Sequence, residues 1–327
     1  MYTRREIVRL AAGASAMMLP LRGGARAQSD VYPSRYITSI CMFAPGSGAD
    51  IFVRFYARKL QELAGQTVVV ENKAGMAGNI ATEYVARSKP DGYTIFIAPA
   101  SSILVAGPFL YKKLNYDPIK DFTSVTTLAK LPFVLVVAPD TVSSVPELVA
   151  RLKQRPDNGF YGAGSTVGLI ASELFKASFG LKTTEVKYKV GLDALNDLIS
   201  HQLDFVFIDP VSIKEMVASG RLKALALTSE QPIAALPGLP GAAQVGIKNM
   251  NLISWWSVHV PAKTPRPIVD KLTVWFNQIA ASDDATKFLS NLGADPLIGS
   301  AELVDQMIAK ETEEWIEYVK IARIEPQ

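Results

Sequence analysis

The chain has 327 residues, which is enough for two domains of ordinary size. Hydrophobic residues make up 49% of it and charged residues 20%, so apolar burial suffices for a folded core and bulk disorder is excluded. The 34 basic and 31 acidic side chains leave a net charge of only +3, which argues against a nucleic-acid-binding protein with a concentrated basic face.

Cysteine and histidine are scarce. Cys41 is the only cysteine, so the chain can form no intramolecular disulfide and no thiolate metal cluster. It lies in an apolar run, where we expect a buried structural thiol. His201 and His259 are far apart in sequence and form no HExxH-like ligand pair. We therefore expect no metal and no cofactor.

Residues 1–27 have the pattern of a secretory signal peptide. Arg4 and Arg5 precede a modestly apolar stretch at 10–21, and residues 25–27 supply the small-x-small pattern of a cleavage site. No later segment supplies the ~20 uninterrupted apolar residues that would span a bilayer. The arginine pair is typical of a twin-arginine signal, with an ordinary secretory signal as the alternative. We expect a periplasmic protein cleaved near Ala27.

The first part of the mature chain alternates strand and helix patterns. Apolar, strand-like runs occur at 36–43, 67–71 and 93–98. Helical apolar spacing follows the first two runs, at 49–63 and at about 80–87. This alternation predicts a doubly wound α/β layer.

A second α/β unit begins near Leu131. Its expected strands are 133–138, 160–162, 185–188, 203–208 and 222–228. Its expected helices are 145–153, 166–178 and 191–200. A Pro- and Gly-rich connection at 231–246 leads to a strand at 252–260. The remaining expected elements are helices at 266–280, 285–291 and 301–321. The fold class is therefore α/β.

One turn joins the first strand to the first helix and is rich in small residues. It consists of Phe43, Ala44, Pro45, Gly46, Ser47, Gly48, Ala49 and Asp50. Free backbone N–H groups and the positive end of the helix dipole point into the space beside such a turn, which suits a carboxylate or phosphate. The glycines let an anion approach the backbone closely, and we expect Asp50 to cap the helix. A tight connecting turn without a ligand is the alternative.

The second unit has a turn of the same design, which contains Gly164, Ser165 and Thr166. It is not a dinucleotide fingerprint, because its third glycine is one residue late and no suitable acidic residue follows. No Walker motif is present. Two anion-binding turns, one in each unit, predict a ligand held between two lobes.

Two further strand ends are expected to face the same crevice, because ligands of such folds lie at the carboxyl ends of the strands. Ala100, Ser101 and Ser102 follow the strand at 93–98, and Asp209 follows the strand at 203–208. Asp209 either binds a hydrogen-bond donor of the ligand or caps the next helix.

The remaining conspicuous residues have structural interpretations. His201 lies in a polar turn and is expected in solvent, and His259 is expected to be structural. Trp255 and Trp256 are expected to pack, with one indole lining the cleft as the alternative. The acidic run at 311–314 is expected on a solvated helical face.

The order and spacing of short motifs resemble the substrate-binding receptors of tripartite tricarboxylate transport systems, the TctC or Bug (Bordetella uptake gene) family. Examples are the turn at 43–50, Lys89-Pro90-Asp91-Gly92-Tyr93-Thr94 and Val186-Lys187-Tyr188-Lys189. Further matching pieces lie at 69–80, 110–122, 161–162, 173–175, 197–198, 219–226 and 260–265. Each piece is weak, but the series covers about 32–323 and is specific as a whole.

The resemblance implies a type II periplasmic-binding-protein fold, with two doubly wound lobes joined by two crossover strands. Lobe 1 is expected at 32–130 plus 250–327 and lobe 2 at 131–249, with the hinge near Leu131 and Met250. The turn at 44–50 is expected to hold the carboxylate with help from the second-lobe turn, and Tyr188 joins the expected ligand-binding residues. The implied protein is a monomer that delivers its ligand to a membrane permease, binds no nucleic acid and is not an enzyme.

The sequence departs from the family pattern at several turn positions. Ser47 replaces the usual second glycine, Ala49 the usual threonine or serine, and Val190 the usual glycine. Ala49, Met76 and Val190 favour an aromatic or otherwise partly apolar monocarboxylate over citrate. A ligand-sensing protein for a signalling partner is an open alternative. A periplasmic enzyme is a weaker one, because no nucleophile with a nearby base is visible.

Overall fold

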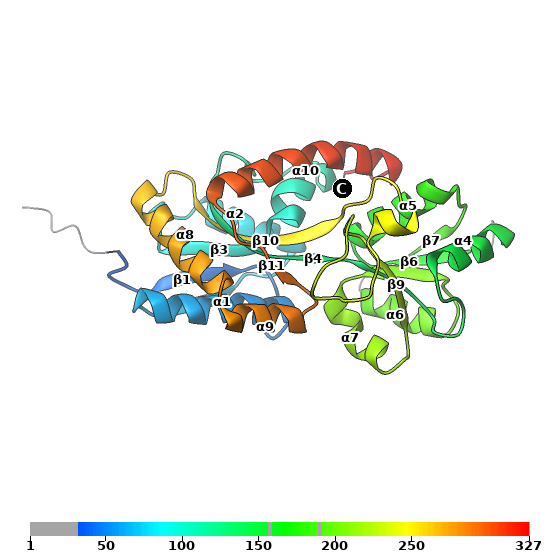
Figure 1. Cartoon of the computed structure of the whole chain (residues 1–327). Coiled ribbons are helices and arrows are strands. Elements are labelled where there is room, and N and C mark those ends of the chain that lie inside the picture. The colour runs from blue at the N-terminus through cyan, green and yellow to red at the C-terminus, as the bar shows by residue number, and fades with distance from the viewer. Residues whose placement is uncertain (1–31, 156–158, 189–190, 327) are drawn as a thin grey trace, which may run out of the picture. The chain divides into compact units, whose positions relative to one another are not determined.

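The computed structural model describes residues 32–155, 159–188 and 191–326. The expected signal peptide at 1–27 lies outside these residues, and so does Val190. Arg35–Gln327 forms one compact unit, which contains two β-sheets with helices packed against them (Figure 1). We call each sheet with its helices a lobe. Two mixed sheets in one chain confirm the two-lobed α/β fold class.

The first lobe contains a six-stranded sheet. Its strands are β1 (Ile37–Cys41), β2 (Val68–Asn72), β3 (Thr94–Pro99), β4 (Phe122–Pro132), β10 (Ile253–Pro261) and β11 (Asp295–Pro296). Their order in the sheet is β11-β4-β10-β3-β1-β2. β1 pairs in parallel with β2 and β3, whereas β10 is antiparallel to β3 and β4. The carboxyl ends of β1 and β3 therefore lie at the same edge of the sheet.

The second lobe contains a five-stranded sheet. Its strands are β5 (Val134–Val137), β6 (Phe160–Ala163), β7 (Thr184–Lys187), β8 (Phe205–Ile208) and β9 (Lys223–Leu227). Their order is β7-β6-β8-β5-β9. β6 is parallel to β7 and β8, and β5 is antiparallel to β8 and β9. The carboxyl ends of β6 and β8 are therefore neighbours, as those of β1 and β3 are in the first lobe.

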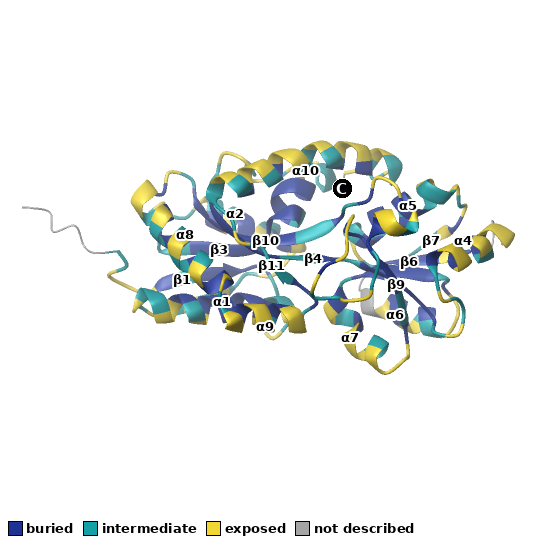
Figure 2. Cartoon of the chain, in the orientation of Figure 1, coloured by how far each residue is buried: buried dark blue, intermediate teal, exposed yellow. Residues whose placement is uncertain are grey.

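Helices cover both sheets. In chain order they are α1 (Gly48–Ala64), α2 (Asn79–Ala86), α3 (Gly107–Leu110), α4 (Val145–Gln154), α5 (Thr166–Phe179), α6 (Gly191–Ile199), α7 (Pro210–Ala218), α8 (Arg266–Ala280), α9 (Asp283–Asn291) and α10 (Ala301–Ile321). Short helical turns are η1 (Met76–Gly78), η2 (Ser101–Ala106) and η3 (Ala242–Val245). Figure 2 shows the pattern of burial: the central strands of both sheets are mostly dark blue, and the outward faces of the helices are yellow.

Four elements, α3, β4, α7 and β11, have no range among the sequence-based expectations, and β4 and α7 are the longest of them. β4 is rich in threonine and lacks a plain apolar pattern, yet Thr126 and Thr127 are fully buried. The Thr126 hydroxyl donates to Asn277 Oδ1 on α8 at 2.7 Å, which makes burial of a polar strand residue tolerable. α7 is short and begins at Pro210, directly after β8.

The two lobes share a hydrophobic core. One cluster of buried side chains includes Leu104 of η2, Leu135 of β5, Phe175 of α5 and Trp255 of β10. α10 contributes Trp315 to this cluster and contacts both β4 and α5. The C-terminal helix therefore packs on elements of both lobes.

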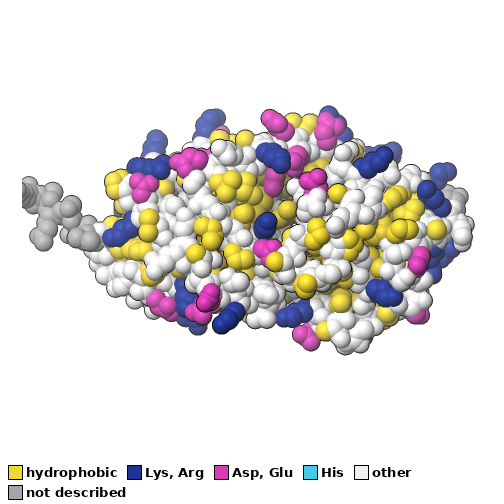
Figure 3. Space-filling model, in the orientation of Figure 1, with side chains coloured by type: hydrophobic (Ala, Val, Ile, Leu, Met, Phe, Trp, Pro, Cys, Tyr) yellow, Lys and Arg dark blue, Asp and Glu magenta, His cyan; other side chains and the backbone are white. Residues whose placement is uncertain are grey.

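The surface carries both signs of charge. On the face shown in Figure 3, basic and acidic side chains are interspersed, and neither sign forms a continuous stripe. None of the described helices has the length and apolar composition needed to cross a membrane.

The acidic run on α10 does not lie wholly on a solvated face, so that expectation is wrong for Glu311. Its carboxylate accepts a hydrogen bond from the indole Nε1–H of Trp255 at 2.6 Å. Burial raises the pKa of Glu311 to about 8, although the bond from Trp255 opposes this shift. Glu313, two residues on, is exposed. The helical period places one carboxyl inward and its neighbour outward.

The raised pKa of Glu311 predicts a pH-dependent stability. The neutral carboxyl fits the folded state, so this stability is fully present below about pH 4.5 and is lost as the pH rises towards 8. Glu311→Gln keeps an acceptor for Trp255 but cannot ionise. We expect the free energy of unfolding of this variant to exceed that of wild type by roughly 1–3 kcal/mol at pH 9. At pH 5 the two proteins should differ little. Denaturant unfolding measures both values.

The control is Glu313→Gln, which removes an exposed charge from the same helix. Its pH dependence should match that of wild type. A Glu311→Gln protein that follows the wild-type pH profile would show that folding does not shift the pKa of Glu311.

Candidate functional site

A cavity of about 480 Å³ lies between the two lobes. The amino-terminal ends of three helices contribute to its wall: α1 from the first lobe, and α5 and α7 from the second. The lining residues are Phe43, Gly48, Ala49, Phe52, Ala77, Pro99, Ser102, Ala106, Leu110, Tyr111, Leu131, Phe133, Ser165, Thr166, Val167, Asp209, Val211, Ser212, Ser254, Trp256, Leu292, Ala294 and Trp315. The volume suits a small organic ligand.

The turn before α1 is built differently from the sequence-based expectation. The N-cap is Ser47, whose hydroxyl accepts the backbone N–H of Asp50 at 3.2 Å. Asp50 lies in the first turn of α1 and is not the cap, so the expected capping role of its carboxylate is wrong. Gly46 adopts a φ of +79°, a left-handed conformation that L side chains rarely adopt. Ser47 is suited to the cap because its side chain is short and polar.

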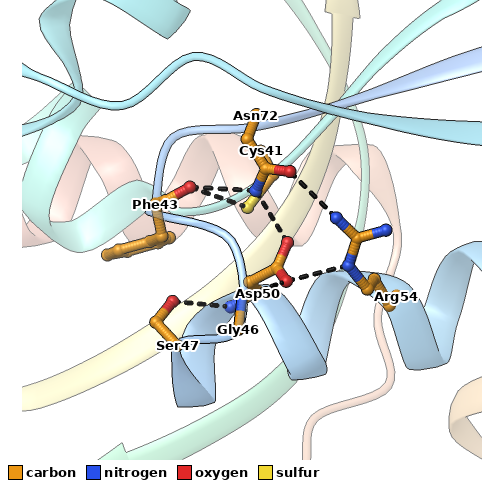
Figure 4. A network of polar contacts seen from close by, with 7 residues as sticks. All are labelled: Cys41, Phe43, Gly46, Ser47, Asp50, Arg54 and Asn72. Atoms are coloured by element: carbon orange, nitrogen blue, oxygen red, sulfur yellow. Dashed lines mark hydrogen bonds and ion pairs between the residues drawn. The ribbon is translucent and has the colours of Figure 1, made fainter.

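Asp50 is buried and holds the turn from behind (Figure 4). One carboxylate oxygen accepts the Gly46 N–H at 2.8 Å and Nε–H of Arg54 at 2.8 Å. The other accepts Nδ2–H of Asn72 at 2.7 Å, and the same amide donates to the Phe43 carbonyl at 2.9 Å. These bonds tie the loop, the first turn of α1 and the end of β2 together.

The electrostatics of the network follow from these contacts. Burial alone would raise the pKa of Asp50, but the hydrogen bonds from Arg54, Asn72 and Gly46 N–H outweigh it and hold the pKa at about 2. Cys41 lies beside this network and is fully buried, as expected, and its burial raises the pKa of the thiol. Asp50 thus stays ionised, and its carboxylate accepts hydrogen bonds from residues that hold the turn in place.

The second-lobe turn presents the amino-terminal end of α5. Ser165 is the N-cap, and its hydroxyl accepts the Gly168 N–H at 3.1 Å. A Cβ on Gly168 would lie 2.7 Å from the Phe207 carbonyl oxygen, so only glycine allows this helix start to pack on β8. The close packing places Thr166 and Val167 at the cavity.

The two serine-capped helices leave backbone donors unpaired. The N–H groups of Gly48 and Ala49 on α1, and of Thr166 and Val167 on α5, have no acceptor among the residues that the structure describes. All four residues line the cavity. Unpaired N–H groups at helix starts carry partial positive charge, so both lobes make the cavity electrostatically favourable for a negatively charged group.

The rest of the wall is mainly apolar and aromatic. The ring centroid of Trp256 lies 5.7 Å from that of Phe43 and 4.3 Å from that of Phe52. Leu131 and Phe133, at the passage from β4 to β5, also line the cavity, and Trp315 of α10 lies on it as well. Of the two adjacent tryptophans, Trp256 lines the cavity, as the alternative interpretation allowed, and Trp255 is buried in the core.

The structure brings seven of the residues expected at the crevice to the cavity wall, namely Phe43, Gly48, Ala49, Ser102, Ser165, Thr166 and Asp209. The other nine do not line it, namely Ala44, Pro45, Gly46, Ser47, Asp50, Ala100, Ser101, Gly164 and Tyr188. Several of these shape the wall from behind, as Asp50 and the Ser47 cap do. Ser101 lines a separate void of about 20 Å³ beside Glu311, and its hydroxyl accepts the Trp255 N–H. Tyr188 donates to Asp197.

The cavity residues that sequence reasoning missed come from distant segments. Val211 and Ser212 lie on α7, Leu292 and Ala294 lie around the end of α9, and Trp315 lies on α10. The expectation that ligands lie at the carboxyl ends of strands predicts residues that follow β-strands. It does not predict residues that helices bring to the cavity by packing.

Neither described histidine lines this cavity: His201 is exposed, and His259 is buried with Nε2 at 2.7 Å from the Ser257 hydroxyl.

A two-lobed α/β fold with a cavity between the lobes is the architecture of periplasmic solute-binding proteins. Residues 52–323 match the family TctC, described as the tripartite tricarboxylate transporter family receptor. The chain belongs to this family, whose members are solute-binding receptors rather than enzymes.

Relatives of known sequence support the assignment. A UPF0065 protein encoded in the tcbD-tcbE intergenic region of Pseudomonas sp. (strain P51) is 32% identical, over 88% of this chain and 86% of its own length. Protein BugT of Bordetella pertussis is 31% identical, over 89% of this chain and 90% of its own.

Solved structures are also similar. Rpa4515 of R. palustris, solved with adipate, is 33% identical, with a TM-score of 0.79 over 90% of this chain and all of its own. The periplasmic binding protein BugD is 28% identical, with a TM-score of 0.75 over 90% of this chain and all of its own. MatC of Rhodopseudomonas palustris, solved with malate, is 25% identical, with a TM-score of 0.72 over 88% of this chain and all of its own.

The low pKa of Asp50 predicts how the scaffold of the turn responds to pH. Its stabilising effect is fully present above about pH 4 and is lost as the pH falls through about 2. Asp50→Asn should therefore lower the free energy of unfolding by about 2 kcal/mol at pH 7, and by much less near pH 2. Chemical unfolding of both proteins across this pH range measures the difference.

Asp283→Asn provides the control, because Asp283 is exposed in the first turn of α9. It should leave the stability within about 0.5 kcal/mol of wild type. If Asp50→Asn were equally harmless at pH 7, the network in Figure 4 would not stabilise the turn.

Proposed function

We propose that this chain is a periplasmic receptor that binds a small organic carboxylate between its two lobes and delivers it to the membrane permease of a tripartite tricarboxylate-type transporter. The observation that carries the proposal is the convergence of unpaired N–H groups from α1 and α5 on one cavity. A carboxylate placed between them accepts donors from both lobes, and its charge is favoured by both helix dipoles. The relatives solved with adipate and malate support a carboxylate ligand.

The ligand is proposed to be an aromatic or otherwise partly apolar monocarboxylate. The cavity wall beyond the two helix starts is formed largely by Phe43, Phe52, Phe133 and Trp256. Among the described lining residues there is no lysine or arginine that would neutralise a second or third carboxylate. An apolar ligand body loses its water contacts against such a wall, whereas citrate would bury charges without partners.

Lobe closure is proposed as the operating step. The proposed division places lobe 1 at 32–130 plus 250–327 and lobe 2 at 131–249. It is supported by the two passages of the chain between sheets, from β4 to β5 at Phe133 and from β9 to β10. A hinge near Leu131 and Met250 would let the ligand bring the α1 and α5 ends together.

Export is proposed to depend on the signal at 1–27, with the arginine pair directing the twin-arginine route. The support is the sequence pattern together with relatives that are periplasmic binding proteins. The membrane permease subunits are the proposed partner, because the matching family is described as a transporter receptor.

Isothermal titration of the purified mature protein tests the ligand class. Benzoate or 3-phenylpropionate should bind measurably, and citrate should bind at least about tenfold more weakly. Native mass spectrometry of the protein as purified should reveal a retained small acid. Tight binding of citrate with no binding of benzoate-like acids would refute the proposed ligand class.

A larger side chain at the anion-binding surface tests the position of the site. Ala49→Leu keeps a good helix former in the first turn of α1 but extends into the cavity. We expect the affinity for 3-phenylpropionate to fall by at least about tenfold, because the side chain occupies the carboxylate position. Calorimetric titration measures the dissociation constant.

Ala281→Leu is the matched control, because Ala281 is exposed at the C-cap of α8 and does not line the cavity. Its affinity should equal that of wild type. Unchanged binding by Ala49→Leu would move the ligand away from the start of α1.

A further inference from the structure

The start of α7 differs chemically from the starts of α1 and α5. Asp209 is its N-cap, and among the described residues that line the cavity it is the only charged one. Its Oδ1 accepts the Ser212 N–H at 2.9 Å, and its Oδ2 accepts the Ser212 hydroxyl at 2.7 Å. The cavity therefore contains a fixed carboxylate besides its two anion-binding helix ends.

The first turn of α7 has few donors left for an anion. Pro210 has no N–H, and the Ser212 N–H is taken by Asp209, so Val211 supplies the one unpaired N–H of these three residues. A negatively charged ligand group at this end would also face the Asp209 carboxylate. The ligand carboxylate therefore belongs at α1 and α5, and a different group must face α7.

The Asp209 carboxylate has acceptor capacity to spare. An ionised carboxylate offers about four lone-pair sites, and Ser212 uses two of them. Both oxygens are held by the same residue, so the carboxylate is fixed in direction before a ligand arrives. A hydroxyl or an ammonium group is the kind of partner that such an acceptor binds.

Contacts across the lobes keep this carboxylate in place. The first-lobe loop after α9 packs on the start of α7: a Cβ on Gly293 would lie 2.7 Å from Cβ of Pro210. Nearby, Lys214 of α7 donates to the Asn291 carbonyl at 3.1 Å. A ligand donor bound by Asp209 would therefore be held where the two lobes touch.

We propose that Asp209 is a specificity-determining acceptor, and that the ligand is a carboxylic acid with a second group that donates a hydrogen bond, a hydroxyl or an ammonium. This inference rests on the proposed function and adds a substrate class to it: hydroxy acids or amino acids with an apolar body. The carboxylate of the ligand lies at α1 and α5, and its donor lies at Asp209. A second carboxylate is selected against, because it would lie beside the Asp209 carboxylate.

A series of acids that share one body tests the proposal by isothermal titration. The probes are 3-phenylpropionate, its 2-hydroxy and 2-amino derivatives, 3-(4-hydroxyphenyl)propionate and the dicarboxylate adipate. In wild type, at least one donor-bearing acid should bind about tenfold more tightly than 3-phenylpropionate. The acid that binds most tightly shows whether the donor is a hydroxyl or an ammonium. It also shows whether the donor lies beside the carboxylate or at the far end of the ligand.

Two variants remove the charge and keep the helix cap. Asparagine and serine are both good N-caps, and Asp209→Ser gives α7 the cap that α1 and α5 have. In Asp209→Asn and Asp209→Ser, the preference for the donor-bearing acid should fall about tenfold, and adipate should bind about tenfold more tightly than it does to wild type. Asp283→Asn, which removes an exposed aspartate from α9, should leave every ratio unchanged.

The outcomes separate this inference from the proposed function. This inference is overturned if 3-phenylpropionate binds as tightly as every donor-bearing acid and the affinity ratios are the same in the Asp209 variants. That result would leave the receptor function intact. Absence of binding by all the acids overturns both. Circular-dichroism melting of each variant within about 3 °C of wild type establishes that a changed affinity is not a folding defect.

Discussion

The proposed ligand binding depends on backbone N–H groups that the fold leaves unpaired. The first turns of α1 and α5 each end a strand-to-helix connection, and a serine caps each of them. Neutral caps satisfy one donor and leave Gly48, Ala49, Thr166 and Val167 with free N–H groups at the same cavity. Because the two helices belong to different lobes, an anion that satisfies both sets also joins the lobes.

The scaffold behind these groups is polar and buried. Asp50 is ionised, yet its charge is used by Gly46, Arg54 and Asn72 and is not exposed to the cavity. A second aspartate, Asp209 at the start of α7, differs from Asp50 because it lines the cavity. The contrast shows that one carboxylate fixes a turn, while the other gives the cavity its only charge among the described lining residues.

Much of the fold and part of the site were predictable from the sequence. The spacing of apolar residues and the positions of turn residues predicted most strands and helices, and α8 and α10 have the expected bounds. β4 was not predictable from apolar alternation, because burial of its Thr126 depends on Asn277, which is distant in sequence. The inward position of Glu311 also depends on a distant partner, Trp255. Local patterns identified the helix starts, but the aromatic wall and Trp315 come from tertiary packing.

Backbone amide chemical shifts test the central claim most directly. In a titration of the isotopically labelled mature protein with 3-phenylpropionate, the amide protons of Gly48, Ala49, Thr166 and Val167 should move downfield together and saturate at one ligand per chain. This result would place the carboxylate between the starts of α1 and α5. Saturating binding that leaves these four amides unmoved, with the largest shifts elsewhere, would contradict the account.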